Sequence, residues 1–260
     1  MSDAPLPEAP LLEERVGAVI VLTLNVPARR NALSLALRGM LTERLRGIEA
    51  DPDIRAIVLR GADGNFCSGG DLTEMNATDF GAARARMATT HRLVRALVGS
   101  AKPVVAAVEG WAAGAGFSVA LCCDLVVAAS DARFVASFGN VGLIGDLGLL
   151  HTLPRRVGEA WARRILLLGE PVDAATAERI GIAHAVTPPG EALQAALAWA
   201  ETLAARAPLA VAMTKAVLAD GLDALLDRER DIQAMLFQTA DHAEGKAAFK
   251  DRRPPRFEGR

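Results

Sequence analysis

Residues 102–128 read KPVVAAVEGWAAGAGFSVALCCDLVVA, and this stretch decides the fold class. The runs 102–109 and 124–128 are rich in valine and alanine and are typical of buried strands. Between them, 114–123 begins with glycines and continues as an apolar helical segment. Because strand, helix and strand follow closely, we expect two parallel strands joined by a right-handed crossover.

The same arrangement is predicted nearer the N-terminus. Strand-like β-branched runs occupy 16–26 and 54–59, and 35–50 between them has Leu, Met and Ile at helical spacing. Beyond residue 159 helical periodicity dominates, over 160–168, 173–180, 191–205, 209–219 and 220–239. We therefore predict an α/β core over 1–200 and a C-terminal helical covering region over 201–260.

Composition narrows the class of protein. The 260 residues carry a net charge of −2, so no overall field attracts nucleic acid or an anionic membrane. The opening residues 1–17 lack the features of a secretory signal, and no apolar run reaches membrane-spanning length. Cys67, Cys122 and Cys123 lack metal-ligand spacing. We expect a cytoplasmic protein with structural thiols and no metal, nucleic-acid or membrane partner.

Two glycine-rich segments point to a site. FCSGGDL at 66–72 follows a strand, and GWAAGAGFSVALCCD at 110–124 passes from a strand into a helix. Glycine lets backbone N–H groups point into a cavity, and a helix begins with its positive end there. A dinucleotide-binding loop is the alternative, but that pattern needs a small residue where Val119 stands.

These segments resemble the enoyl-CoA hydratase/isomerase (crotonase) family. Further similar stretches are PARRNALS at 27–34, KPVVAAVEG at 102–110, VGL and LPR around Asp146, and the terminal AFKDRRPPRFEGR. The resemblance implies a crotonase-like spiral of repeated β-β-α units with a C-terminal helical region, assembled as a homotrimer or hexamer. It also implies an acyl-CoA substrate, with CoA as part of the substrate and no separate cofactor.

The resemblance assigns Gly70 and Ala115 as the two N–H donors that hold the thioester oxygen. Such donors stabilise the oxygen most when it becomes anionic during reaction. Hydratases of the family use two glutamates, whose positions are Ser118 and Phe138 here. Neither side chain can replace a carboxylate acid/base, which disfavours hydration and also the dienoyl-CoA isomerases that use these positions.

Asp146, in the loop GLIGDLG, stands where isomerases of the family place an acid. One carboxylate suffices for a 1,3-proton shift, and apolar Phe138, Leu143 and Leu147 would raise its pKa towards neutrality. We therefore predict a double-bond isomerase acting on an enoyl-CoA in fatty-acid or aromatic-acid catabolism, with Asp146 as proton carrier.

Alternatives to isomerisation stay open. His91 together with Asp146 resembles the histidine and nucleophilic aspartate of the family's 4-chlorobenzoyl-CoA dehalogenases, so hydrolysis or dehalogenation is the second candidate. A histidine on an amphipathic helix is, however, more often a packing residue. A hydratase, or a CoA-ester binding protein without turnover, is a further alternative. We expect structural roles for Asp124 and His151, and for Asp71 a role in fixing its turn.

Binding of the polyanionic CoA requires cations. Arg29 and Arg30 follow the first predicted strand, where the family places nucleotide contacts. In the family the C-terminal helix of a neighbouring subunit also touches the nucleotide, which would involve Phe249 and Arg252. The remaining expected substrate contacts lie in or near the motif segments: Ser68, Asp71, Leu72, Gly114, Ser118 and Phe138.

Overall fold

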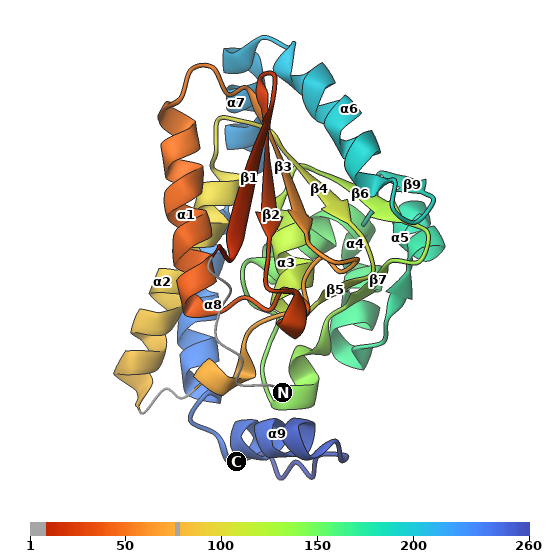
Figure 1. Ribbon diagram of the computed structural model, residues 1–260. Helices are drawn as coiled ribbons and strands as arrows, with labels where there is room; N and C mark the ends of the chain where they lie inside the picture. Colours follow the sequence, from red (N-terminus) through yellow and green to blue (C-terminus); the bar gives the residue numbers. More distant parts are fainter. Residues whose placement is uncertain (1–8, 76–78) are drawn as a thin grey trace.

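A six-stranded sheet forms the centre of the computed structural model, which describes residues 9–75 and 79–260 (Figure 1). Its order is β1-β2-β3-β4-β6-β9. Every pairing from β2 to β9 is parallel, which confirms the predicted α/β class. The strands are β1 (Leu11–Val16), β2 (Val19–Leu24), β3 (Ala56–Gly61), β4 (Val104–Val108), β6 (Leu125–Ala129) and β9 (Ala185–Thr187).

The N-terminal part of the sheet differs from the prediction of one strand over 16–26. A tight turn at Gly17, with φ at 60°, separates β1 from β2, and the two strands pair antiparallel. The residues of β1 are mostly exposed, so its sequence LLEERV lacks the apolar character of an inner strand. The first strand is therefore an edge strand that hydrophobic periodicity does not reveal.

A second, smaller sheet has the order β5-β7-β8 and was not predicted. Its strands are β5 (Trp111–Ala113), β7 (Arg133–Val135) and β8 (Val172–Asp173). Segments this short are below the length at which periodicity identifies a strand. The sheet nevertheless places the site, because β5 leads directly into helix α3.

Both faces of the large sheet are buried under helices. One face packs against α1 (Leu35–Ala50), α2 (Phe80–Val98) and α3 (Ala115–Cys122). The other packs against α6 (Ala192–Ala204), which presents Ala192, Ala196 and Ala200 to Val19 and Val21 of β2. Alternate strand residues point to opposite faces, so β2 contributes Ile20 and Leu22 to the first layer. The predicted helix 35–50 is confirmed, and it begins at Ser34, whose hydroxyl accepts the N–H of Leu37.

The C-terminal third is helical, as predicted. It contains α4 (Leu149–Leu168), α5 (Ala174–Ile180), α7 (Pro208–Leu218), α8 (Leu222–Leu236) and α9 (Ala240–Asp251). The prediction began the first of these at residue 160, whereas α4 starts at Leu149 and is interrupted at Gly158, where φ is 74°. Residue 200, the predicted boundary between core and covering region, lies within α6. In the described parts of the chain, no helix combines the length and apolar character needed to cross a membrane.

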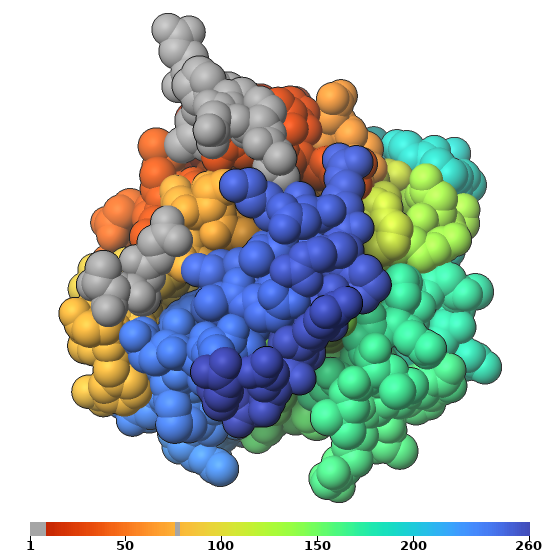
Figure 2. Space-filling model, turned by 90° about the horizontal axis from the view of Figure 1, so that it is seen from below, coloured from red at the N-terminus to blue at the C-terminus, as the bar shows by residue number. Residues whose placement is uncertain are grey.

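The described residues also form short 3₁₀ turns, namely η1 (Pro27–Arg29), η2 (Leu72–Glu74) and η3 (Ser137–Val141). Helix α9 packs against η3, where Gly245 lies so close that an added Cβ would be 2.6 Å from the Cα of Val141. His242 bonds the carbonyl of Val141 through Nδ1 at 2.7 Å, and Lys246 donates to the carbonyl of Met75 at 2.7 Å. The C-terminal segment therefore spreads over this face of the molecule (Figure 2).

Candidate active site

The two glycine-rich segments lie against each other at the ends of neighbouring strands. The first is held on both sides, because the N–H of Leu33 donates to Gly69 and the N–H of Ala113 donates to Cys67. Gly69 has φ at 111°, and a Cβ there would lie 3.0 Å from the carbonyl oxygen of Ala113 and 3.7 Å from the nitrogen of Ala115. The left-handed backbone at Gly69 therefore brings the first turn beside the start of α3.

Two backbone N–H groups in these turns are available for a ligand. Within the described residues, the N–H of Gly70 and the N–H of Ala115 have no protein acceptor, whereas the adjacent Asp71 and Gly114 donate to Leu33 and Val135. Ala115 is the first residue of α3, so its N–H lies outside the helical ladder at the positive end. Neither group is therefore taken up by a backbone acceptor within the described residues.

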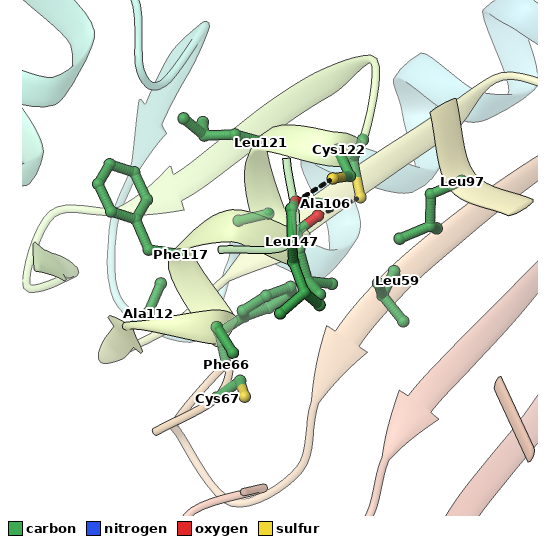
Figure 3. Packing of buried hydrophobic residues seen from close by; sticks show 14 of the residues in the cluster. Leu59, Phe66, Cys67, Leu97, Ala106, Ala112, Phe117, Leu121, Cys122 and Leu147 are labelled. Carbon is green, nitrogen blue, oxygen red and sulfur yellow. Dashed lines mark hydrogen bonds between the residues drawn. The ribbon is translucent and has the colours of Figure 1, made fainter. Parts of the chain in front are cut away.

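Buried packing fixes the start of α3. A Cβ at Gly116 would lie 2.4 Å from the carbonyl oxygen of Cys67, so this position requires glycine. Phe66, Phe117 and the cysteines pack in the same cluster (Figure 3). Burial raises the pKa of the Cys67 thiol to about 12 and also raises the pKa of Cys122. These thiols are protonated packing groups.

Asp146 is the acid that stands out in the interior. It is 5% exposed, and its Oδ1 has no hydrogen-bond partner among the described residues. Burial raises its pKa to about 7, the charge of Glu229 adds to this rise, and Arg38 and Arg86 oppose it. A carboxyl group with a pKa near neutrality can both accept and return a proton.

The loop that carries Asp146 is anchored by two helices. Leu147 and Gly148 both have positive φ, at 49° and 74°. The thiol of Cys122 donates to the carbonyl of Leu147 at 3.4 Å, a bond drawn in Figure 3. From α8, Oε2 of Glu229 accepts the N–H of Gly148 at 2.9 Å. Helices α3 and α8 therefore set the position of Asp146 together.

His91 faces Glu229. The Nε2 of His91 lies 2.8 Å from Oε1 of Glu229, and the histidine is 2% exposed. Because Oε2 of Glu229 accepts the N–H of Gly148, both oxygens of this carboxylate have hydrogen-bond partners. The structure thus places His91 behind the Asp146 loop, in a buried pair with a residue 138 positions away in the chain. Sequence reasoning missed Glu229, because a lone glutamate on a helix is normally a solvent-exposed residue.

Arg38 is a second residue that sequence reasoning missed. It is 4% exposed, and its Nη1 donates to the hydroxyl of Thr90 at 3.0 Å. Its Nη2 lies beside Gly70, where an added Cβ would be 2.9 Å away. Its charge also acts on Asp146. One buried guanidinium therefore lies between the first glycine-rich turn and the acid.

Several side chains that were predicted to contact the substrate are hydrogen-bonded to nearby residues of the protein. Asp71 accepts from the N–H and hydroxyl of Thr73 and from Arg29, whose Nη1 lies 2.7 Å away. The hydroxyl of Ser68 donates to the carbonyl of Arg29. The side chains of Arg29 and Asp71 thus join η1, the turn after β2, to the first glycine-rich segment. Arg30 is exposed, and Leu72 is partly buried against the core.

The two positions at which hydratases carry glutamates are occupied here by Ser118 and Phe138, and both side chains are buried. Ser118 is fully buried and donates to the carbonyl of Gly114 at 3.3 Å, and Phe138 is buried in η3. Gly114, with φ at 50°, forms the turn into α3. Phe249 and Arg252 lie exposed at the end of α9.

The other polar residues named in the sequence analysis, Asp124 and His151, form bonds away from Asp146 and the glycine-rich turns. Asp124 accepts the N–H of Val104 and pairs with Lys215 of α7. His151 contacts Arg155 one helical turn later. Hollows at the C-terminal end are lined by α9 and the tail, where Arg253 already pairs with Glu244. Over the described ranges, no cluster of His, Cys, Asp and Glu side chains is arranged to hold a metal ion.

The sequence of this chain is similar to those of known proteins over nearly its whole length. The sequence model of the enoyl-CoA hydratase/isomerase family matches residues 14–260. A 1,2-epoxyphenylacetyl-CoA isomerase of Escherichia coli is 37% identical over 250 residues, covering 93% of this chain and 95% of the relative. A 2,3-dehydroadipyl-CoA hydratase of the same organism is 37% identical over 254 residues, covering 96% and 99%.

A solved structure is also similar over the whole length. The crystal structure of an enoyl-CoA hydratase from Mycobacterium avium subsp. paratuberculosis superposes with a TM-score of 0.87 at 32% identity. The match covers 97% of this chain and 100% of that one. The predicted crotonase-like fold is thereby confirmed, whereas the names of the relatives include both isomerases and hydratases.

Proposed function

Because this chain belongs to the enoyl-CoA hydratase/isomerase family, we propose that it moves a double bond within an enoyl-CoA thioester and that Asp146 carries the proton. One observation supports this choice above the others. Asp146 is a buried acid with an unpaired oxygen and a pKa of about 7, and the two glutamate positions of hydratases hold Ser118 and Phe138.

The proposed reaction starts from a 3-enoyl thioester. The carboxylate of Asp146 removes a proton from the α-carbon, and the C–H electron pair delocalises through the β,γ double bond and the thioester carbonyl. The protonated Asp146 then returns the same proton to the γ-carbon, which leaves the double bond between the α- and β-carbons. No water is added, and the enzyme ends in its starting state.

The intermediate dienolate needs stabilisation at its oxygen. The N–H groups of Gly70 and Ala115 are the proposed donors, because both are free of protein acceptors and belong to turns that lie together. Fixed donors of this kind need no rearrangement as the negative charge develops. The positive end of α3 adds to the same effect.

Hydrolysis or dehalogenation, with His91 activating water, is less well supported. The Nε2 of His91 lies 2.8 Å from a buried carboxylate that also holds the Asp146 loop. We propose instead that His91 positions this loop through Glu229. For the CoA nucleotide, we propose contacts from the exposed Arg30 and from Phe249 and Arg252 of a neighbouring subunit in a homotrimer or hexamer. A cytoplasmic location also stays a prediction.

Proton exchange in heavy water tests the assignment of the base. A 3-enoyl-CoA incubated with the wild-type protein should form 2-enoyl-CoA, and some deuterium should appear at the α- or γ-carbon from exchange at Asp146. Asp146→Asn should abolish both product and exchange, while Asp131→Asn, an exposed position, should change neither. Full activity of Asp146→Asn would show that another group carries the proton.

A further inference from the structure

The Arg38 guanidinium is buried next to the site without an acidic hydrogen-bond partner. Its Nη1 donates to Thr90, while Nε and Nη2 are buried and have no acceptor in the described part of the chain. Burying an unpaired ion is costly, and an arginine cannot lose its charge in a protein. The two unpaired nitrogens form one edge of the guanidinium plane, which is the fork that matches both oxygens of a carboxylate.

The acidic side chains near Arg38 form hydrogen bonds with other groups. Asp71 is bonded to Arg29 and Thr73, and Oε2 of Glu74 accepts the N–H of Leu35 at 2.7 Å. Oδ1 of Asp146 is itself unpaired, so it is not bonded to this fork. A second cation, Arg86, lies near enough to act on both Arg38 and Asp146. The Nε–Nη2 edge of Arg38 is therefore left without an acidic hydrogen-bond partner among the described residues.

The fork also lies close to the reacting end of the substrate. A Cβ at Gly70 would be 2.9 Å from Nη2 of Arg38, and the N–H of Gly70 is a proposed thioester oxygen donor. The fork therefore lies beside the same glycine that is proposed to hold the thioester oxygen.

We propose that the acyl group of the substrate ends in a carboxylate, which the Nε–Nη2 edge of Arg38 binds. This inference rests on the proposed function in one respect, namely that the thioester oxygen binds at Gly70. The substrate class is then the CoA thioesters of short dicarboxylic acids. The other role open to Arg38 is stabilisation of the enolate alone, which would favour neutral and carboxylated acyl groups equally.

Binding of unreactive thioesters separates these roles. Dissociation constants would be measured by calorimetry for succinyl-, glutaryl- and adipyl-CoA and for the neutral butyryl-, pentanoyl- and hexanoyl-CoA of matching length. For at least one length, wild type should bind the dicarboxylic member about 10-fold tighter or more, the expected effect of a charge-assisted bond. Arg38→Met should remove that preference. Absence of any preference in the wild type, or its persistence in Arg38→Met, would overturn the inference.

Matched control variants test whether the preference depends on the Nε–Nη2 edge of Arg38. Arg46→Met lies on the same helix with an exposed side chain and should leave the preference unchanged. Thr90→Val removes the protein bond to Nη1 but keeps the charge, so the preference should remain. Should Arg38→Met fail to fold, Arg38→Lys keeps the charge without the fork and should lower the preference several-fold; an unchanged preference in Arg38→Lys would also overturn the inference.

These binding assays are independent of turnover. If 3-enoyl-CoA is not isomerised while the preference depends on Arg38, the proposed reaction fails and the substrate class stands. If isomerisation depends on Asp146 while no dicarboxylic preference exists, the reaction stands and the role of Arg38 is wrong.

Discussion

Oε2 of Glu229 accepts the N–H of Gly148 at 2.9 Å, which ties helix α8 to the loop that carries Asp146. The same carboxylate pairs with His91 on α2 through its other oxygen. Since Glu229 also raises the pKa of Asp146, one buried glutamate both positions the acid and adjusts its proton affinity.

Replacing Glu229 should therefore change the pH dependence of turnover. In the proposed reaction Asp146 must be ionised to accept the proton, so activity should rise as the pH passes upward through about 7. Glu229→Gln removes the negative charge while keeping an acceptor for Gly148, and should move this rise to lower pH by about half a unit or more. Asp223→Asn, an exposed acid on the same helix, should leave the profile in place. An unmoved profile in Glu229→Gln would contradict the coupling.

The stability of the protein should depend on Asp146 in a defined pH window. The folded pKa of about 7 is above the unfolded value, so the folded state binds the proton more tightly. The contribution of Asp146 to stability is thus lost as the pH rises from about 4 through about 7. Relative to wild type, Asp146→Asn should gain stability between about pH 5 and about pH 8, by at most about 3 kcal/mol. Urea unfolding at both pH values measures the gain; an equal difference at both would exclude a raised pKa.

The packing at the start of α3 predicts a strict requirement for glycine at position 116. Gly116→Ala places a Cβ 2.4 Å from the carbonyl oxygen of Cys67, and the forced shift should cost about 1–3 kcal/mol and reduce turnover. Gly39→Ala on α1 meets no atom within 4 Å and should be neutral or stabilising. Thermal unfolding of both variants checks this, and equal stability of the two would refute the close approach.

Ser118 stands where hydratases carry a glutamate, yet it should not take part in the reaction. Its hydroxyl is fully buried and donates to the carbonyl of Gly114, which is a bond within α3 and its cap. Ser118→Ala should therefore keep turnover within about 3-fold of wild type, because the loss of one neutral hydrogen bond has a modest effect. A loss of turnover comparable to that of Asp146→Asn would assign Ser118 a chemical role.

The elements with strong periodicity were predictable from sequence. Helix 35–50 and the parallel strands on either side of α3 appear where the patterns place them. The exposed edge strand β1 and the three-residue strands β5 and β7 were not predicted, because hydrogen bonding to neighbours, rather than composition, makes them strands.

The parts of the candidate site that depend on glycine-rich turns were predictable from the sequence. The parts that depend on charged residues far away in the chain were not. The glycine-rich turns can be identified from the motifs FCSGGDL and GWAAGAG. Arg38 and Glu229 cannot, because each lies on a helix whose polar residues are mostly exposed. Their burial results from the packing of α1 against α2 and of α2 against α8, which brings together residues far apart in the chain.

In the proposed reaction, Asp146 moves a proton within the substrate without adding water. The most direct measurement is mass-resolved turnover of 3-enoyl-CoA and 2-enoyl-CoA in heavy-oxygen water, with wild type beside Asp146→Asn. We predict interconversion without uptake of labelled oxygen in the wild type and its loss in the variant. Incorporation of labelled oxygen, or undiminished interconversion by Asp146→Asn, would contradict the account.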